Sequence, residues 1–99
     1  MNITNFTFDA NSGHLIIHDG VTKVPGYGYF RRHDIKSVQI PDTILSIGEY
    51  AFSNKRLSEV IIPASVTSIG LHAFSSNVLT EINIPDSVTS IGSGAFSNN

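Results

Sequence analysis

The feature that most constrains this chain is a phrase that recurs at a constant interval, without a gap, through its C-terminal two thirds. The copies IPDTILSIGEYAFSNK, IPASVTSIGLHAFSSN and IPDSVTSIGSGAFSNN begin at Ile40, Ile62 and Ile84, which sets a 22-residue period. The proline, glycine, alanine and phenylalanine columns recur in register: Pro41, Pro63, Pro85; Gly48, Gly70, Gly92; Ala51, Ala73, Ala95; Phe52, Phe74, Phe96. A period of this length is typical of a solenoid, in which each repeat buries its apolar side chains only against its neighbours.

A more divergent copy precedes these three. Residues 15–30, LIIHDGVTKVPGYGYF, align with the next copy at a spacing one position longer than the regular period, so that Leu15 matches Val38. With this longer spacing, Pro25 falls in the glycine column and Gly28 in the alanine column. Tyr29 falls in the phenylalanine column. An atypical first repeat is expected at the end of a solenoid, where one face has no neighbour.

Each repeat predicts two short extended stretches. In residues 79–84, LTEINI, the apolar positions finish in the period-two alternation of a strand. Pro85 ends that strand because proline donates no backbone hydrogen bond. In residues 87–92, SVTSIG, a second extended stretch ends at Gly92, which we expect to allow a bend that a Cβ would resist. Stacked at about 4.8 Å, such strands form ladders of equivalent side chains.

The chain divides into a cap and a solenoid. Residues 1–14 predict a capping hairpin, with a strand from Ile3 to Phe8, a turn over DANSG, and a second strand that runs into residues 14–18. We expect this hairpin to cover the first edge of the solenoid, residues 15–99. The predicted repeats are a degenerate one at 15–34 and regular ones at 35–56, 57–78 and 79–99.

The motif Ile-Pro-x-Ser-Val-Thr-x-Ile-Gly-x-x-Ala-Phe, at residues 62–74 and 84–96, resembles the BspA-like (Treponema-type) bacterial leucine-rich repeats. The resemblance is close over residues 35–99 and loose over 15–34. It implies a mainly β fold: a right-handed leucine-rich-repeat solenoid with 22-residue coils, short parallel strands and an N-terminal β-hairpin cap. It also leads us to expect that the chain is a piece of a longer protein.

This chain departs from the family after the Ala-Phe pair. The family's usual repeat is one residue longer and often has cysteine there, whereas this chain has no cysteine and places Lys55, Asn77 and Asn99 nearby. We expect the asparagine amides to satisfy backbone groups at this corner.

Catalytic and metal chemistry find little support, so we predict a protein that is not an enzyme and has no cofactor. Asp19, Asp42 and Asp86 share a column that could hold calcium between coils. Ala64 interrupts that column and aspartate after proline is a good turn residue, so we favour a turn role. We expect the four histidines to lie at the surface: His14, His18, His33 and His72.

Charge and hydropathy exclude two kinds of partner. The net charge is −2, and the basic residues form no stripe of the kind that nucleic-acid binding needs. No apolar run approaches the roughly 20 residues of a membrane-spanning helix. The N-terminal residues also lack the charged and apolar segments of a signal peptide. We therefore expect no nucleic-acid partner and no membrane insertion.

Two surfaces are candidates for binding. The outward residues of the first extended stretch should form a concave binding face: Lys36, Ser37, Gln39, Ser58, Glu59, Ile61, Thr80, Glu81 and Asn83. The second candidate patch is chosen because tyrosine and arginine are favoured at binding hot spots: Tyr27, Tyr29, Arg31 and Arg32.

These features predict a non-catalytic protein-interaction module. The resemblance implies a surface or secreted adhesin-like parent protein, with a host-surface or matrix protein as partner. One alternative is a targeting or spacer region of a larger enzyme or toxin. A third interpretation, a carbohydrate-binding module, needs a row of exposed aromatic residues. Tyr27, Tyr29 and Tyr50 qualify, but we assign Leu71 to Tyr50 as its neighbour in the repeat, which interrupts a row.

The last repeat has no predicted cap. Its apolar side chains and backbone edge should therefore be open, which provides a template for another chain. We expect a homodimer through this C-terminal repeat.

Overall fold

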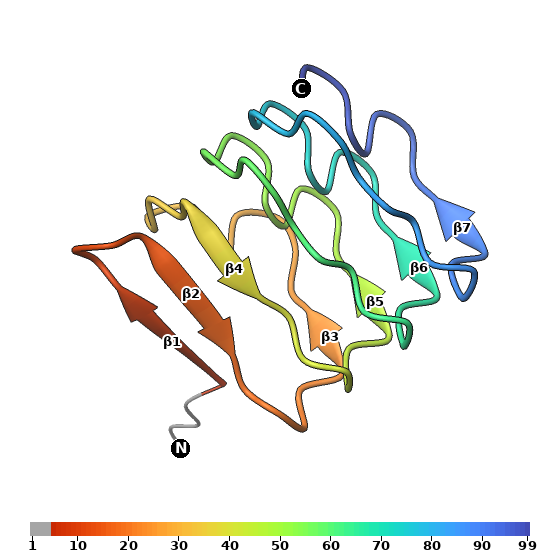
Figure 1. Cartoon of the computed structure of the whole chain (residues 1–99), viewed down its shortest axis with the longest axis horizontal. Helices are drawn as coiled ribbons and strands as arrows, with labels where there is room; N and C mark the ends of the chain where they lie inside the picture. The colour runs from red at the N-terminus through yellow and green to blue at the C-terminus, as the bar shows by residue number, and fades with distance from the viewer. Residues whose placement is uncertain (1–4) are drawn as a thin grey trace.

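The computed structural model describes residues 5–99, and within them the chain forms strands and turns without a helix (Figure 1). The strands belong to two sheets, and successive repeats lie side by side along the molecule. The hairpin lies at one end and the last repeat at the other. The predicted start of the hairpin at Ile3 lies outside the described residues. No helix in the described range is long and apolar enough to cross a membrane.

The first sheet has the order β1-β2-β4. Strands β1 (Phe6–Asp9) and β2 (His14–Ile17) form an antiparallel hairpin, and β2 pairs in parallel with β4 (Ser37–Gln39). In the second pairing Leu15 lies opposite Val38, at the longer spacing predicted from the sequence. The hairpin is thereby joined to the repeats through β2.

The second sheet has the order β3-β5-β6-β7 and is parallel throughout. Its members are β3 (Lys23–Val24), β5 (Ser46–Ile47), β6 (Ser68–Ile69) and β7 (Ser90–Ile91). Partners in β5, β6 and β7 are one full period apart, since Ile47 lies opposite Ile69 and Ile69 opposite Ile91. Short parallel strands in a mainly β fold are thus present, while the hand of the winding stays a prediction.

The prediction that the first extended stretch of every repeat is a strand is wrong for the last two repeats. It forms β2 and β4 in the first two repeats, but residues 57–62 and 79–84 contain no strand. The continuous ladder instead uses the second stretch, where the glycine column lets backbones approach closely. Proline does not explain the difference, since Pro41 follows β4 in the same place as Pro63 and Pro85. Strand β4 differs in having the hairpin strand β2 as its partner.

The glycine column acts through close approach rather than through a bend. Gly48, Gly70 and Gly92 do not have positive φ angles. A Cβ on Gly70 would lie 2.7 Å from the backbone nitrogen of Glu49, and one on Gly92 would lie 2.3 Å from that of Leu71. These positions require glycine because each presses against the backbone of the preceding repeat.

Phenylalanine rings form a continuous stack through the core. Ring centroids lie 5.5 Å apart for Phe52 and Phe74, and 5.4 Å apart for Phe74 and Phe96. The assignment of Tyr29 to this column is wrong: Phe30 stacks on Phe52 at 5.8 Å and 7°, whereas Tyr29 is 53% exposed. The first repeat carries one additional residue between Tyr27 and Phe30, so the longer spacing returns to the regular period there.

Burial falls at the C-terminal end in the isoleucine column, whereas the alanine column stays buried to its last member. Ile47 and Ile69 are each 2% exposed, whereas Ile91, the next member of their column, is 49% exposed. The core therefore consists of ladders whose inner members are covered on both sides by neighbouring repeats.

Candidate binding surfaces

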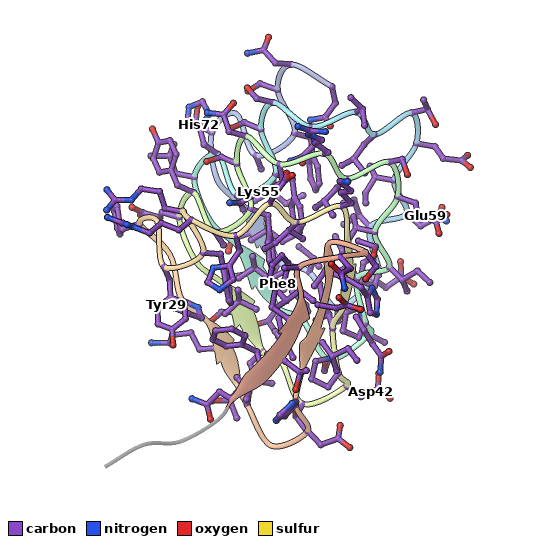
Figure 2. The ribbon with its side chains drawn as sticks, turned by 90° about the vertical axis from the view of Figure 1, so that its left-hand side faces the viewer. Phe8, Tyr29, Asp42, Lys55, Glu59 and His72 are labelled. Atoms are coloured by element: carbon purple, nitrogen blue, oxygen red, sulfur yellow. The ribbon has the colours of Figure 1, made fainter. Side chains whose placement is uncertain are left out.

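The predicted binding face lies along one side of the repeats but is not a continuous sheet. Its residues come from β4 and from two segments without strands. All but one of the nine are exposed: Lys36, Gln39, Ser58, Glu59, Ile61, Thr80, Glu81 and Asn83. Figure 2 shows Glu59 on the side of the molecule opposite Tyr29 and His72. This face is therefore separate from the tyrosine-rich surface.

Ser37 differs from the rest of that face. It is half-buried, and its Oγ lies 2.6 Å from Nδ1 of His14. This hydrogen bond crosses from β4 to β2, so Ser37 helps to join the repeats to the hairpin. Within residues 5–99, Glu59 and Glu81 form no salt bridge, which leaves both carboxylates available to a partner.

The structure divides the second predicted patch in two. Tyr27 and Arg31 line a hollow of about 380 Å³, together with Tyr50 from the next repeat. Tyr29 points instead toward the hairpin, with its ring 5.9 Å from that of Phe6, and Arg32 is exposed outside the hollow.

Beside this hollow runs an aromatic row made of Tyr27, Tyr50 and His72. Ring centroids of Tyr27 and Tyr50 are 6.2 Å apart at an interplanar angle of 37°, and those of Tyr50 and His72 are 5.1 Å apart at 17°. The assignment of Leu71 as the neighbour of Tyr50 is wrong, because Leu71 stands one repeat after Glu49 and His72 stands one repeat after Tyr50. A row of aromatic side chains thus exists that the sequence analysis missed.

The row is held in an unusual backbone conformation. Tyr27, Tyr50 and His72 have φ angles of 51°, 59° and 52°, and Gly94 continues the column at 65°. The Tyr27 hydroxyl donates a hydrogen bond to the Glu49 carboxylate. A Cβ on Gly94 would lie 2.6 Å from the His72 ring, so the aromatic row ends where glycine takes its place.

The asparagine corner forms as predicted from the sequence. Asn77 is 6% exposed; its Oδ1 accepts from the Leu57 N–H at 3.1 Å, and its Nδ2 donates to the Phe52 carbonyl at 2.9 Å. Asn99 repeats the pattern one turn later, accepting from the Leu79 N–H at 3.0 Å. Each amide therefore joins two repeats through their backbones.

Lys55 takes the corner position one repeat earlier. Its Nζ donates to the carbonyls of Phe30 and His33 at 2.6 and 2.8 Å. Desolvation lowers the pKa of Lys55 below its ordinary value, and the Asp34 carboxylate opposes that change. The ammonium group thus replaces the amide as a donor to carbonyls of the first repeat.

The four histidines that were expected at the surface are only partly exposed: His14, His18, His33 and His72. His18 Nε2 lies 2.7 Å from the Thr7 hydroxyl, and the His33 ring lies 4.9 Å from that of Phe8 in an edge-on contact. The three aspartates of the predicted turn column are exposed: Asp19, Asp42 and Asp86. Residues 5–99 contain no group of three potential metal ligands.

Comparison with known proteins gives one finding. A family model described as "BspA type Leucine rich repeat region (6 copies)" matches residues 2–99. No curated protein and no solved structure matches the chain at a significant level. The match covers the hairpin as well as the repeats.

Proposed function

The chain belongs to the BspA-type leucine-rich repeat family, and from that premise we propose that it is a non-catalytic protein-interaction module of an adhesin-like protein at the cell surface or in secretion. Repeat families of this kind present rows of outward side chains on a rigid backbone. The partner in this proposal is a host-surface or matrix protein.

The observation that carries the proposal is the exposure of Ile61. This side chain is 81% exposed, although its neighbours Val60 and Ile62 are 9% and 6% exposed. A large apolar side chain is thus presented outward from a segment anchored in the core on either side. An apolar contact with a rim of polar side chains is the usual composition of a protein interface.

Charge indicates the chemistry of the partner. Glu59 lies beside Ile61 in the same repeat, and Glu81 is its counterpart in the next. Both are exposed and without a salt bridge in the described part of the chain. A basic patch around an apolar pocket would complement this surface, and the charges would act mainly on the rate of association.

The test is a binding assay on immobilised matrix and cell-surface proteins with two matched charge reversals. Glu59→Lys with Glu81→Lys should weaken binding about tenfold. Asp19→Lys with Asp86→Lys changes the net charge equally at exposed sites outside the face and should leave binding within about twofold. The thermal midpoints of both variants should equal that of the parent protein.

Two results would contradict the proposal. Equal loss of binding in both variants would mean that only the total charge matters. A lower thermal midpoint in the Glu59/Glu81 variant would mean that these side chains stabilise the fold instead. Ile61→Ser provides a second measurement, because it removes the apolar contact without altering charge.

A further inference from the structure

The hollow beside the aromatic row has an open ring face at one end. Tyr50 and His72 are nearly parallel and cover one another, whereas Tyr27 diverges from Tyr50 by 37°. Tyr27 is 77% exposed and Tyr50 is 39% exposed. A ligand entering the hollow of about 380 Å³ therefore contacts the largely exposed ring of Tyr27 and the less exposed ring of Tyr50.

The backbone under this row is left-handed in each repeat, from Tyr27 through Gly94, so the fold requires the conformation but not an aromatic side chain. A left-handed conformation costs a residue with a Cβ about 1 kcal/mol or more, and glycine escapes that cost. Gly94 shows that glycine fits the same column. The chain nevertheless places tyrosine at two of these positions, with one side chain 77% exposed and the other 39% exposed. The left-handed conformation also occurs at Asn54, Ser76 and Asn98, so the aromatic side chains rather than the strain set this column apart.

Positive charge is concentrated at the Tyr27 end of the hollow. Arg31 and Lys55 line it, and no carboxylate is among the lining residues. Arg31 forms no salt bridge within residues 5–99. Glu49 lies close by, but its carboxylate already accepts the Tyr27 hydroxyl. An anionic group in the hollow would thus meet an unpaired guanidinium, which can bind a carboxylate through two parallel hydrogen bonds.

The polar lining is suited to hydroxyl groups. Ser53 and Asn54 contribute a hydroxyl and an amide from the repeat that carries Tyr50. Asn54 is exposed, so its donors and acceptors are accessible. The combination of aromatic faces with a few polar groups is typical of sites that fix a small ligand.

We propose that the hollow formed by Tyr27, Tyr50 and Arg31 binds an acidic saccharide, with the pyranose ring packed on Tyr27 and its carboxylate on Arg31. The C–H face of a pyranose packs on an aromatic face, and its hydroxyls reach Ser53 and Asn54. The site is separate from the face around Ile61 and can bind independently of it.

A nucleic acid would need a different surface. Single-stranded nucleic acids require cations along the whole track of the backbone in addition to stacking residues. Here the cations lie at one end of the row, and the net charge of the chain is −2. A single uronic acid packed on Tyr27 needs only one cation, which Arg31 supplies.

The experiment is isothermal titration of the whole chain with oligogalacturonates and with hyaluronan oligosaccharides. Carboxyl-reduced forms of the same oligosaccharides and a single-stranded oligonucleotide serve as comparison ligands. At least one acidic saccharide should bind, and its reduced form should bind about tenfold more weakly because the contact with Arg31 is lost.

Two pairs of matched variants locate the site. Tyr27→Gly should weaken binding about tenfold or more without lowering the thermal midpoint, since glycine relieves the strained φ of 51°. Tyr29→Ala removes a tyrosine outside the hollow and should leave binding unchanged. Arg31→Gln should abolish the preference for the acidic over the reduced form, and Arg32→Gln should preserve it.

Each outcome either supports or overturns the proposed saccharide site. Loss of binding in Tyr27→Gly and retention in Tyr29→Ala support the site. The proposal is overturned if no acidic saccharide binds, if the oligonucleotide binds equally well, or if Arg31→Gln and Arg32→Gln behave alike. Binding of a matrix protein through Tyr27 in the absence of saccharide binding would also overturn it and would assign the row to a protein interface.

Discussion

The repeated core is covered at its N-terminal end and exposed at its C-terminal end. At the N-terminal end the β1–β2 hairpin brings Phe6 and Phe8 against the first repeat, where Phe6 lies 5.0 Å from Phe30 in an edge-on contact. At the C-terminal end Ile84 and Ile91 are 36% and 49% exposed. Phe30 is consequently 2% exposed, whereas Phe96 at the other end of the same stack is half-buried.

The difference shows that burial in this fold depends on the neighbouring repeat rather than on the residue. Ile69 and Ile91 occupy equivalent places in identical SVTSIG phrases, yet their exposures are 2% and 49%. Stability in stacked repeats is approximately a sum of interfaces between neighbours. Opening should therefore begin at β7 and proceed toward the hairpin.

The largest expected effect comes from the phenylalanine stack. Phe52→Ala should cost about 3–5 kcal/mol of unfolding free energy, because Phe52 is fully buried between Phe30 and Phe74. Phe96→Ala should cost about 1–2 kcal/mol, because Phe96 has one stacking neighbour. Urea unfolding measures both, and equal costs would break the comparison between the ends.

The next largest difference in unfolding free energy is expected between the two asparagines of the corner, Asn77 and Asn99. Asn77→Ala leaves the Leu57 N–H and the Phe52 carbonyl without their partner in a buried place and should cost about 2–3 kcal/mol. Asn99→Ala should cost about 0.5–1 kcal/mol, since Asn99 is exposed. Thermal unfolding monitored by far-UV circular dichroism ranks the two. A larger loss for Asn99 would mean that the last repeat is as firmly held as the middle one.

Substitutions in the glycine column should show a smaller difference in unfolding free energy between the middle and the end of the solenoid. Gly70→Ala should cost about 1–3 kcal/mol, because its Cβ would meet the backbone of Gly48 and Glu49 while the following repeat holds it in place. Gly92→Ala should cost about 1 kcal/mol or less, since β7 is the edge strand and can move away. Comparison of the midpoints in urea tests this, and an equal shift would show that the edge is rigid.

The smallest expected effect is a pH dependence confined to the hairpin. The Asn11 N–H donates to the Asp9 carboxylate at 2.9 Å, and this bond holds the pKa of Asp9 below 3.8. Because the folded pKa is lowered, the stabilisation is present above pH 3.8 and is lost as pH falls through the folded value. Amide exchange at Asn11 should speed up there, and Asp9→Asn should remove that dependence. A simultaneous change at β7 would contradict a local origin.

The sequence predicted the repeated core well because its columns are in register. Phe52, Phe74 and Phe96 stack as the regular period requires. The same reasoning failed at Phe30, because a single added residue shifts the register without altering composition. It also could not choose between the two stretches of each repeat, since both were predicted to be extended. Close approach at Gly70 favours the second, and that contact belongs to the neighbouring repeat.

The candidate sites were harder to predict, for a related reason. The exposed members of the first face follow from alternation, and eight of nine lie at the surface. The aromatic row was missed because Leu71 was assigned to the column of Tyr50, although the regular period places His72 there. Positive φ angles along it depend on the turn between repeats, which no local pattern shows. The homodimer through the last repeat stays a prediction, and analytical ultracentrifugation can test it.

The additional residue in the first repeat has a consequence for how such a gene can change. It lies between Tyr27 and Phe30, in an outward turn, and the stack resumes its register at Phe52 without disturbance. One codon can therefore be gained or lost at this turn while neighbouring repeats keep their contacts. The same event inside Ser68–Ile69 would turn inward side chains to solvent along the strand. Length variation among copies of this repeat should accordingly concentrate at the turn that carries the aromatic row.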